Sequence, residues 1–106
     1  MAGPAGPQGA AGTARAWARV NADGTLAQGV NIAGTTLQPF TGIYCVVPIA
    51  SINPAQTAPV ATLDFTVGFI STLNGGCSNA FGVGIQVNTY DTSATPANRA
   101  FFIAVP

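Results

Sequence analysis

The chain opens with four consecutive triplets, each of which starts with glycine. The repeat begins at Gly3 and returns at Gly6, Gly9 and Gly12, and proline fills the second place of the first two triplets. In a triple helix of polyproline II chains, every third residue meets the common axis, where only a hydrogen atom fits as a side chain. This spacing predicts a collagen-like stem over residues 1–14, and such a stem needs three chains.

The predicted stem is too short to hold three chains together by itself. Four triplets span about 37 Å at roughly 3.1 Å per residue, and so few contacts do not offset the entropy lost when three chains are ordered. A flexible Gly/Pro-rich linker would share the composition but would lack the strict period. We therefore expect residues 15–106 to form a trimerising head. Because Met1 runs directly into the repeat, we also expect a longer collagen region upstream.

A scarcity of charge supports a permanent homo-oligomer. Of the 106 residues, 6% are charged and 48% are hydrophobic, and lysine, glutamate and histidine are absent. An isolated chain of this kind would be poorly soluble, whereas obligate interfaces are depleted of charge. The net charge of zero provides no basic surface for nucleic acid, and the longest apolar run, residues 43–50, is too short to insert into a membrane. The expected partners are two further copies of the chain.

The pattern of short apolar runs and turn residues predicts an all-β head, because no window shows the 3.6-residue period of a helix. Strands are predicted over residues 14–20, 25–32, 35–40, 43–49, 60–70, 81–88 and 99–105. Turns or loops are predicted over residues 21–24, 51–59, 71–79 and 91–98. This number of strands suits a jelly-roll-like β-sandwich in a threefold homotrimer. Three single sheets forming a trimeric β-prism are the alternative.

Three of these strands carry expectations about the core. The first, over residues 60–70, is expected to bury Ala61, Leu63, Phe65, Val67 and Phe69. The second, over residues 81–88, is expected to bury Phe81, Val83, Ile85 and Val87. The third, over residues 43–49, is apolar on both faces, which is typical of a strand that is covered on both sides.

The two cysteines, Cys45 and Cys77, are expected to form a structural disulfide, since a collagen-like stem indicates an extracellular, cell-surface or virion-surface setting in which disulfides persist. Identical cysteines cannot pair off among three chains without leaving one free. Cys45 must therefore bond to Cys77 either within the chain or in the next chain of the ring. We favour the bond within the chain, because a two-sheet fold can provide the required Cα separation of about 5.5 Å.

The region after the triplets resembles the C-terminal heads of bacterial and phage collagen-like proteins. The resemblance rests on residues 12–20 (GTARAWARV), 23–26 (DGTL) and 42–46 (GIYCV). It is similar above all to actinobacterial collagen-like surface proteins, and more distantly to trimeric heads of the C1q and tumour-necrosis-factor type. The resemblance implies a trimeric, jelly-roll-like head that nucleates the triple helix.

The residue types needed for catalysis are scarce, because only three aspartates and three arginines remain to shuttle a proton. We therefore expect no enzyme activity, no catalytic or metal-ligating residue and no cofactor. Residues 21–24 contain only a fragment of a calcium-binding loop and are expected to form a turn. Asp64 is expected to be solvated or paired with arginine, unless three copies meet at a trimer axis and hold a metal.

The candidate binding residues lie next to the stem and in the last strand. Arg15, Trp17 and Arg19 share one face of the first strand, where stacking on a carbohydrate or cation–π recognition is one interpretation. Packing across a subunit boundary is the interpretation that we favour. The last strand adds three candidate interface residues: Phe101, Phe102 and Ile103. The predicted function is a structural trimerisation head, and the alternative is an adhesive tip that binds a receptor or glycan.

Overall fold

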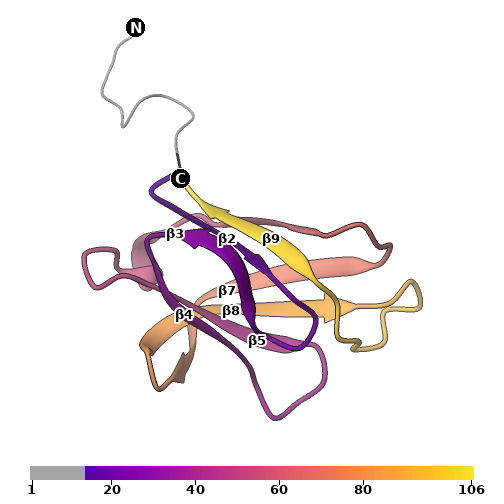
Figure 1. The fold of residues 1–106 in the computed structure, drawn as a ribbon. Coiled ribbons are helices and arrows are strands. Elements are labelled where there is room, and N and C mark those ends of the chain that lie inside the picture. The colour runs from indigo at the N-terminus through magenta and orange to yellow at the C-terminus, as the bar shows by residue number, and fades with distance from the viewer. Residues whose placement is uncertain (1–13) are drawn as a thin grey trace, which may run out of the picture.

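The computed structural model describes residues 14–106 and shows two antiparallel sheets of four strands each (Figure 1). This confirms the predicted all-β class and its sandwich arrangement. Each chain contains two sheets, unlike the single sheet per chain of the β-prism alternative. The predicted stem, with Gly3, Gly6, Gly9 and Gly12, lies outside the described residues apart from its last residue, Ala14.

The first sheet has the strand order β3-β2-β9-β6. Its members are β2 (Ala16–Val20), β3 (Leu26–Val30), β6 (Val60–Leu63) and β9 (Phe101–Val105). Along β2 the residues alternate between buried and exposed, as predicted, because one face meets the core and the other faces outward. The predicted turn after β2 is also present, and Gly24 takes a φ of 90° there, which is a conformation that glycine adopts without strain.

The second sheet has the strand order β4-β5-β8-β7. Its members are β4 (Ile32–Leu37), β5 (Ile43–Pro48), β7 (Phe69–Asn79) and β8 (Gly82–Tyr90). A short 3₁₀ helix, η1 (Pro54–Gln56), lies in the loop between β5 and β6. As predicted for a strand covered on both sides, β5 is buried over all but its first residue.

The strand predicted over residues 25–32 is divided between the two sheets. Asn31 has a φ of 58° and separates β3 from β4. Asparagine tolerates this left-handed conformation better than most residues, and its side-chain Nδ2 donates a hydrogen bond to the carbonyl oxygen of Arg15 over 2.8 Å. The prediction was wrong because the pattern of apolar residues does not reveal where a strand leaves one sheet for the other.

The core lies between the two sheets and contains side chains from both. Tyr44 of β5 and Phe101 of β9 pack edge to face with ring centroids 5.0 Å apart, and both are fully buried. The Tyr44 hydroxyl donates a hydrogen bond to the Ala22 carbonyl oxygen over 2.7 Å and accepts one from the Arg99 amide over 3.0 Å. Burial raises the pKa of this hydroxyl above its usual value. The shift is away from neutral pH, where a tyrosine hydroxyl is protonated in any case, so Tyr44 keeps donating this hydrogen bond.

The strand predicted over residues 60–70 is wrong in its second half. It breaks after Leu63, and the chain crosses from β6 in the first sheet to β7 in the second. Ala61 and Leu63 pack against the core as expected. Three other side chains that were expected in the core are exposed: Phe65, Val67 and Phe69. Phe65 and Val67 lie in the segment that joins the two sheets, which has no second sheet above it. Phe69 begins β7 on its outward face, because its neighbour Ile70 is the residue that packs against the core.

The loop predicted over residues 71–79 is also wrong, because these residues belong to the long strand β7. A bulge between Leu73 and Cys77 accommodates the Gly75-Gly76 pair inside the strand. On β8, Ile85 and Val87 are buried as expected, whereas Phe81 and Val83 are more than half exposed. The β7–β8 hairpin extends beyond the area that the first sheet covers, so its tip contributes no core residues.

Candidate functional site

The outer face of the first sheet is the surface that brings together three of the six candidate interface residues. Residues that pair directly across antiparallel strands point to the same face. The registers align two rows of outward side chains: Val30, Trp17, Ala104 and Val60 in one, and Gln28, Arg19, Phe102 and Thr62 in the other. We call these eight residues the outer face. Five of these eight side chains are apolar, although they lie on the outside of the single chain.

A hollow of about 280 Å³ lies in the outer face. Its lining comes from β2, β6 and β9 and includes Trp17, Val60, Thr62, Phe102 and Ala104. Trp17 is 37% exposed, Phe102 39% and Val60 64%. Large apolar side chains that are adjacent and partly exposed mark an interaction surface rather than a surface that stays in contact with solvent.

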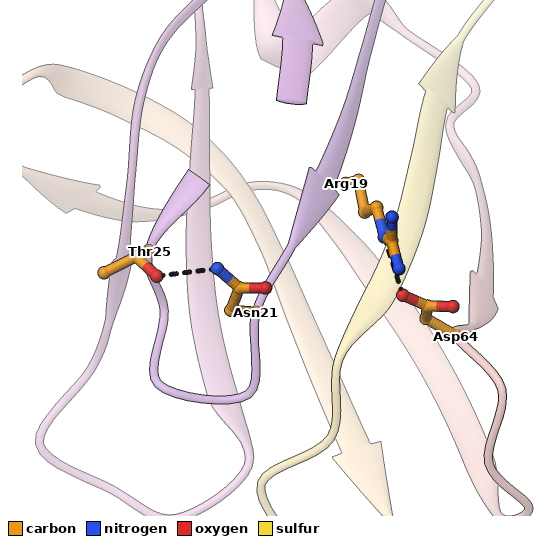
Figure 2. A network of polar contacts seen from close by, with 4 residues as sticks. All are labelled: Arg19, Asn21, Thr25 and Asp64. Carbon is orange, nitrogen blue, oxygen red and sulfur yellow. Dashed lines mark hydrogen bonds and ion pairs between the residues drawn. The ribbon is translucent and has the colours of Figure 1, made fainter. Parts of the chain in front are cut away.

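One ion pair borders this surface. Arg19 Nε donates a hydrogen bond to Asp64 Oδ2 over 2.9 Å, and the Asp64 side chain is only 14% exposed (Figure 2). The guanidinium carbon of Arg19 also lies 5.5 Å from the centre of the Phe102 ring. Asp64 is thus paired with arginine, which is one of the two states expected for it. Arg19 contributes no net charge to the outer face, because its partner neutralises it.

The first described residues enter the first sheet beside the C-terminus. The Arg15 amide donates to the Val105 carbonyl oxygen over 2.7 Å, and Arg15 Nε donates to the Pro106 carbonyl oxygen over 2.8 Å. Figure 1 shows the chain entering β2 next to the end of β9. Because β2 and β9 are the two central strands of the first sheet, the outer face begins where the triplets end.

The structure separates the predicted interface residues into two groups. Trp17, Arg19 and Phe102 lie on the outer face, and Arg15 lies beside it at the stem junction. Phe101 and Ile103 are 0% and 2% exposed and belong to the core of the single chain, so their expected place at an interface is corrected. Successive residues of a strand point to opposite faces, and only one face of β9 is available to a partner.

The predicted disulfide joins Cys45 and Cys77 within one chain, with a Cα separation of 5.8 Å. It is an unusual bridge, because β8 lies between β5 and β7 in the sheet, so the bond passes over a strand. Gly84 of β8 pairs with Cys77, and a Cβ at Gly84 would lie only 2.9 Å from Cys45 Sγ. Glycine at this position leaves room for the bridge, which sequence reasoning did not foresee.

The polar residues of the turn after β2 are hydrogen-bonded to one another. Asp23 Oδ1 accepts hydrogen bonds from the Thr25 hydroxyl and amide over 2.6 and 3.0 Å, and these bonds lower the pKa of Asp23. A further bond joins Asn21 Nδ2 to the Thr25 hydroxyl (Figure 2), so these residues form a turn as expected. Within residues 14–106, no group of three or more Cys, Asp, Glu or His side chains could hold a metal, and no helix could span a membrane.

Comparison with known proteins adds no relative. No protein-family model matches the chain, and no curated protein or solved structure is significantly similar to it.

Proposed function

We propose that the chain is a non-enzymatic trimerisation head that nucleates and registers a collagen-like triple helix in an extracellular protein of a cell or virion surface. The observation that carries this proposal is the position of the apolar outer face beside the stem junction. Three copies that each bury this face in the trimer bring three stems together at one end. The tether raises the effective concentration of the stems and starts them in register.

The arrangement of strands is compatible with this role. The first strand β2 pairs with the last strand β9, and β5 pairs with β8. This nesting of early with late strands in two facing sheets leads us to assign the head to the jelly-roll class. The assignment agrees with the resemblance to heads of bacterial and phage collagen-like proteins.

Light scattering of the purified chain at micromolar concentration tests the proposal. We expect three times the mass of one chain. Removal of residues 1–13 should leave a folded trimer, because the outer face stays intact, whereas a peptide of residues 1–14 should show no cooperative triple-helix melt by circular dichroism. A monomeric or dimeric full-length chain would contradict the proposal, and a monomer after the deletion would show that the stem assembles first.

A second function, binding of a glycan or cell-surface receptor, is supported by a separate hollow of about 560 Å³. It is lined by Phe81 and Val83 of the hairpin and by Pro48, Asn53 and Pro54, which combines an aromatic ring with polar groups as ligand sites do. It lies on the second sheet and would stay exposed in the trimer. A glycan array with the natural chain and Phe81→Ala tests it, and binding by neither chain or equally by both would exclude this site.

A further inference from the structure

The segment between β6 and β7 carries an aromatic side chain that the single chain does not use. Phe65 is 104% exposed, and Val67 beside it is 72% exposed. Phe65 also has a φ of 56°, in the left-handed region that an L-residue with a large side chain rarely adopts. Such strain persists where the surrounding structure imposes it, commonly at sites of function. Both the exposure of this apolar ring and its backbone conformation therefore destabilise the isolated chain.

Phe65 is held firmly from both sides. The Asp64 amide donates to the Ala100 carbonyl oxygen over 2.9 Å, and the Asp64 carboxylate is paired with Arg19. On the other side, Gly68 has a φ of 146° and packs so closely on Tyr90 that a Cβ would overlap the Tyr90 carbonyl oxygen. The chain thus presents the ring from a fixed position at the edge of the first sheet, next to the outer face.

A threefold ring requires each chain to have a second contact surface in addition to the outer face. In a closed ring of three chains each contact is heterologous, so every chain must offer two different and complementary surfaces. The outer face, with its hollow, is the first. Phe65 has the largest fractional exposure of the large apolar side chains in residues 14–106, and it lies one residue from the ion pair that borders that face.

We infer that Phe65 of each chain inserts into the hollow between Trp17, Val60 and Phe102 of the next chain and so closes the ring. The inference rests on the proposed trimerisation function and specifies the contact between neighbouring chains. A cavity of about 150 Å³ admits a benzene ring, so the hollow of about 280 Å³ has room for the Phe65 ring. The apolar lining suits an aromatic side chain, and Arg19 is already paired with Asp64, so insertion of the ring would bury no unpaired charge.

A second copy of this chain is the occupant that the sequence favours. The triplets predict three chains per assembly, so two further copies of Phe65 are held in the same complex as each hollow. Any other apolar partner would have to compete with a ring that is tethered to the same stem.

The variant Phe65→Asn tests the contact because it separates assembly from folding. Asparagine tolerates positive φ, so the variant should melt at the same temperature as the natural chain or higher when both are dilute and monomeric. The chain concentration at which half of the protein is trimeric, measured by analytical ultracentrifugation, should rise at least about tenfold. Phe40→Asn is the matched control, since Phe40 is 68% exposed at the second sheet and its replacement should leave the trimer unchanged.

A cross-link between positions 65 and 104 of neighbouring chains tests whether the Phe65 ring occupies the hollow. The Asp64 amide bonds to the Ala100 carbonyl oxygen, and Ala100 is four residues from Ala104, or about 13 Å at 3.3 Å per residue. Phe65, the next residue after Asp64, is therefore too far from Ala104 of the same chain for a disulfide. The double variant Phe65→Cys with Ala104→Cys, oxidised as the full-length chain, should give a covalent trimer on a denaturing gel without reductant. Each single variant should remain a single-chain band.

The outcomes distinguish the inference from the function on which it rests. A natural chain that is monomeric overturns both. A trimer that Phe65→Asn does not weaken overturns the role of Phe65 and leaves the trimerisation function standing. If Phe65→Asn weakens the trimer but positions 65 and 104 never cross-link, Phe65 contributes to assembly but does not bind in the hollow.

Discussion

The substitution Ala104→Asp will convert the proposed trimer into monomers at micromolar concentration. Ala104 lies at the centre of the outer face, between Trp17 on β2 and Val60 on β6. In the trimer its side chain would be buried among apolar groups, and an unpaired carboxylate there costs several kcal/mol in each contact. A loss of about 3 kcal/mol already corresponds to more than a hundredfold weaker association.

The fold of the single chain should survive this substitution, because the Ala104 side chain points away from the core. Circular dichroism should therefore show an unchanged β spectrum, while light scattering shows one third of the trimer mass. Ala80→Asp is the matched control, since Ala80 is exposed in the turn between β7 and β8, and it should remain trimeric. A trimeric Ala104→Asp chain would place the subunit contact elsewhere on the head.

Removal of the disulfide will lower the stability of the head by about 3 to 4 kcal/mol. The bond closes a loop with a sequence separation of 32 residues, and the chain-entropy model assigns that amount to a loop of this length. It also ties β5 to β7 across β8, so its loss should free the β7–β8 hairpin tip, which makes no contribution to the core. For a domain of this size, the melting temperature should fall by at least about 12 °C.

The measurement compares the natural chain with the double variant Cys45→Ser, Cys77→Ser at one protein concentration, because the melting temperature of a trimer depends on concentration. The variant should still be trimeric, since neither cysteine is on the outer face. Without reductant, the natural chain should run as a single-chain band that migrates faster than its reduced form. A melting temperature within about 2 °C of the natural chain would show that the bridge does not stabilise the head.

Several features of the fold follow from local patterns along the chain. The alternation in β2 predicted both its strand and its exposed face, and the unbroken apolar run of β5 predicted burial on both sides. The candidate residues Trp17, Arg19 and Phe102 were found in this way. These predictions succeed because the pleat of a strand makes burial alternate with a period of two residues, whatever lies nearby.

The predictions of burial that were wrong share a different physical cause. An apolar residue in a strand is buried only if a second layer covers it, and coverage depends on parts of the chain that are distant in sequence. Phe65 and Val67 continue the apolar pattern of β6, yet they lie in the crossing between two sheet edges and remain exposed. Phe101 was assigned to an interface because β9 is apolar on both faces, but one of these faces is the core.

The sequence by itself determined the all-β class, the pairing partners Cys45 and Cys77 and the expectation of three chains, because turn chemistry, side-chain alternation and the glycine period are local properties. Only the tertiary structure decided where the chain changes sheets, that the disulfide passes over β8 at Gly84, and that Arg19 is neutralised by Asp64. Each of these depends on the distance between residues far apart along the chain, and such distances are set by how the two sheets pack rather than by any segment alone.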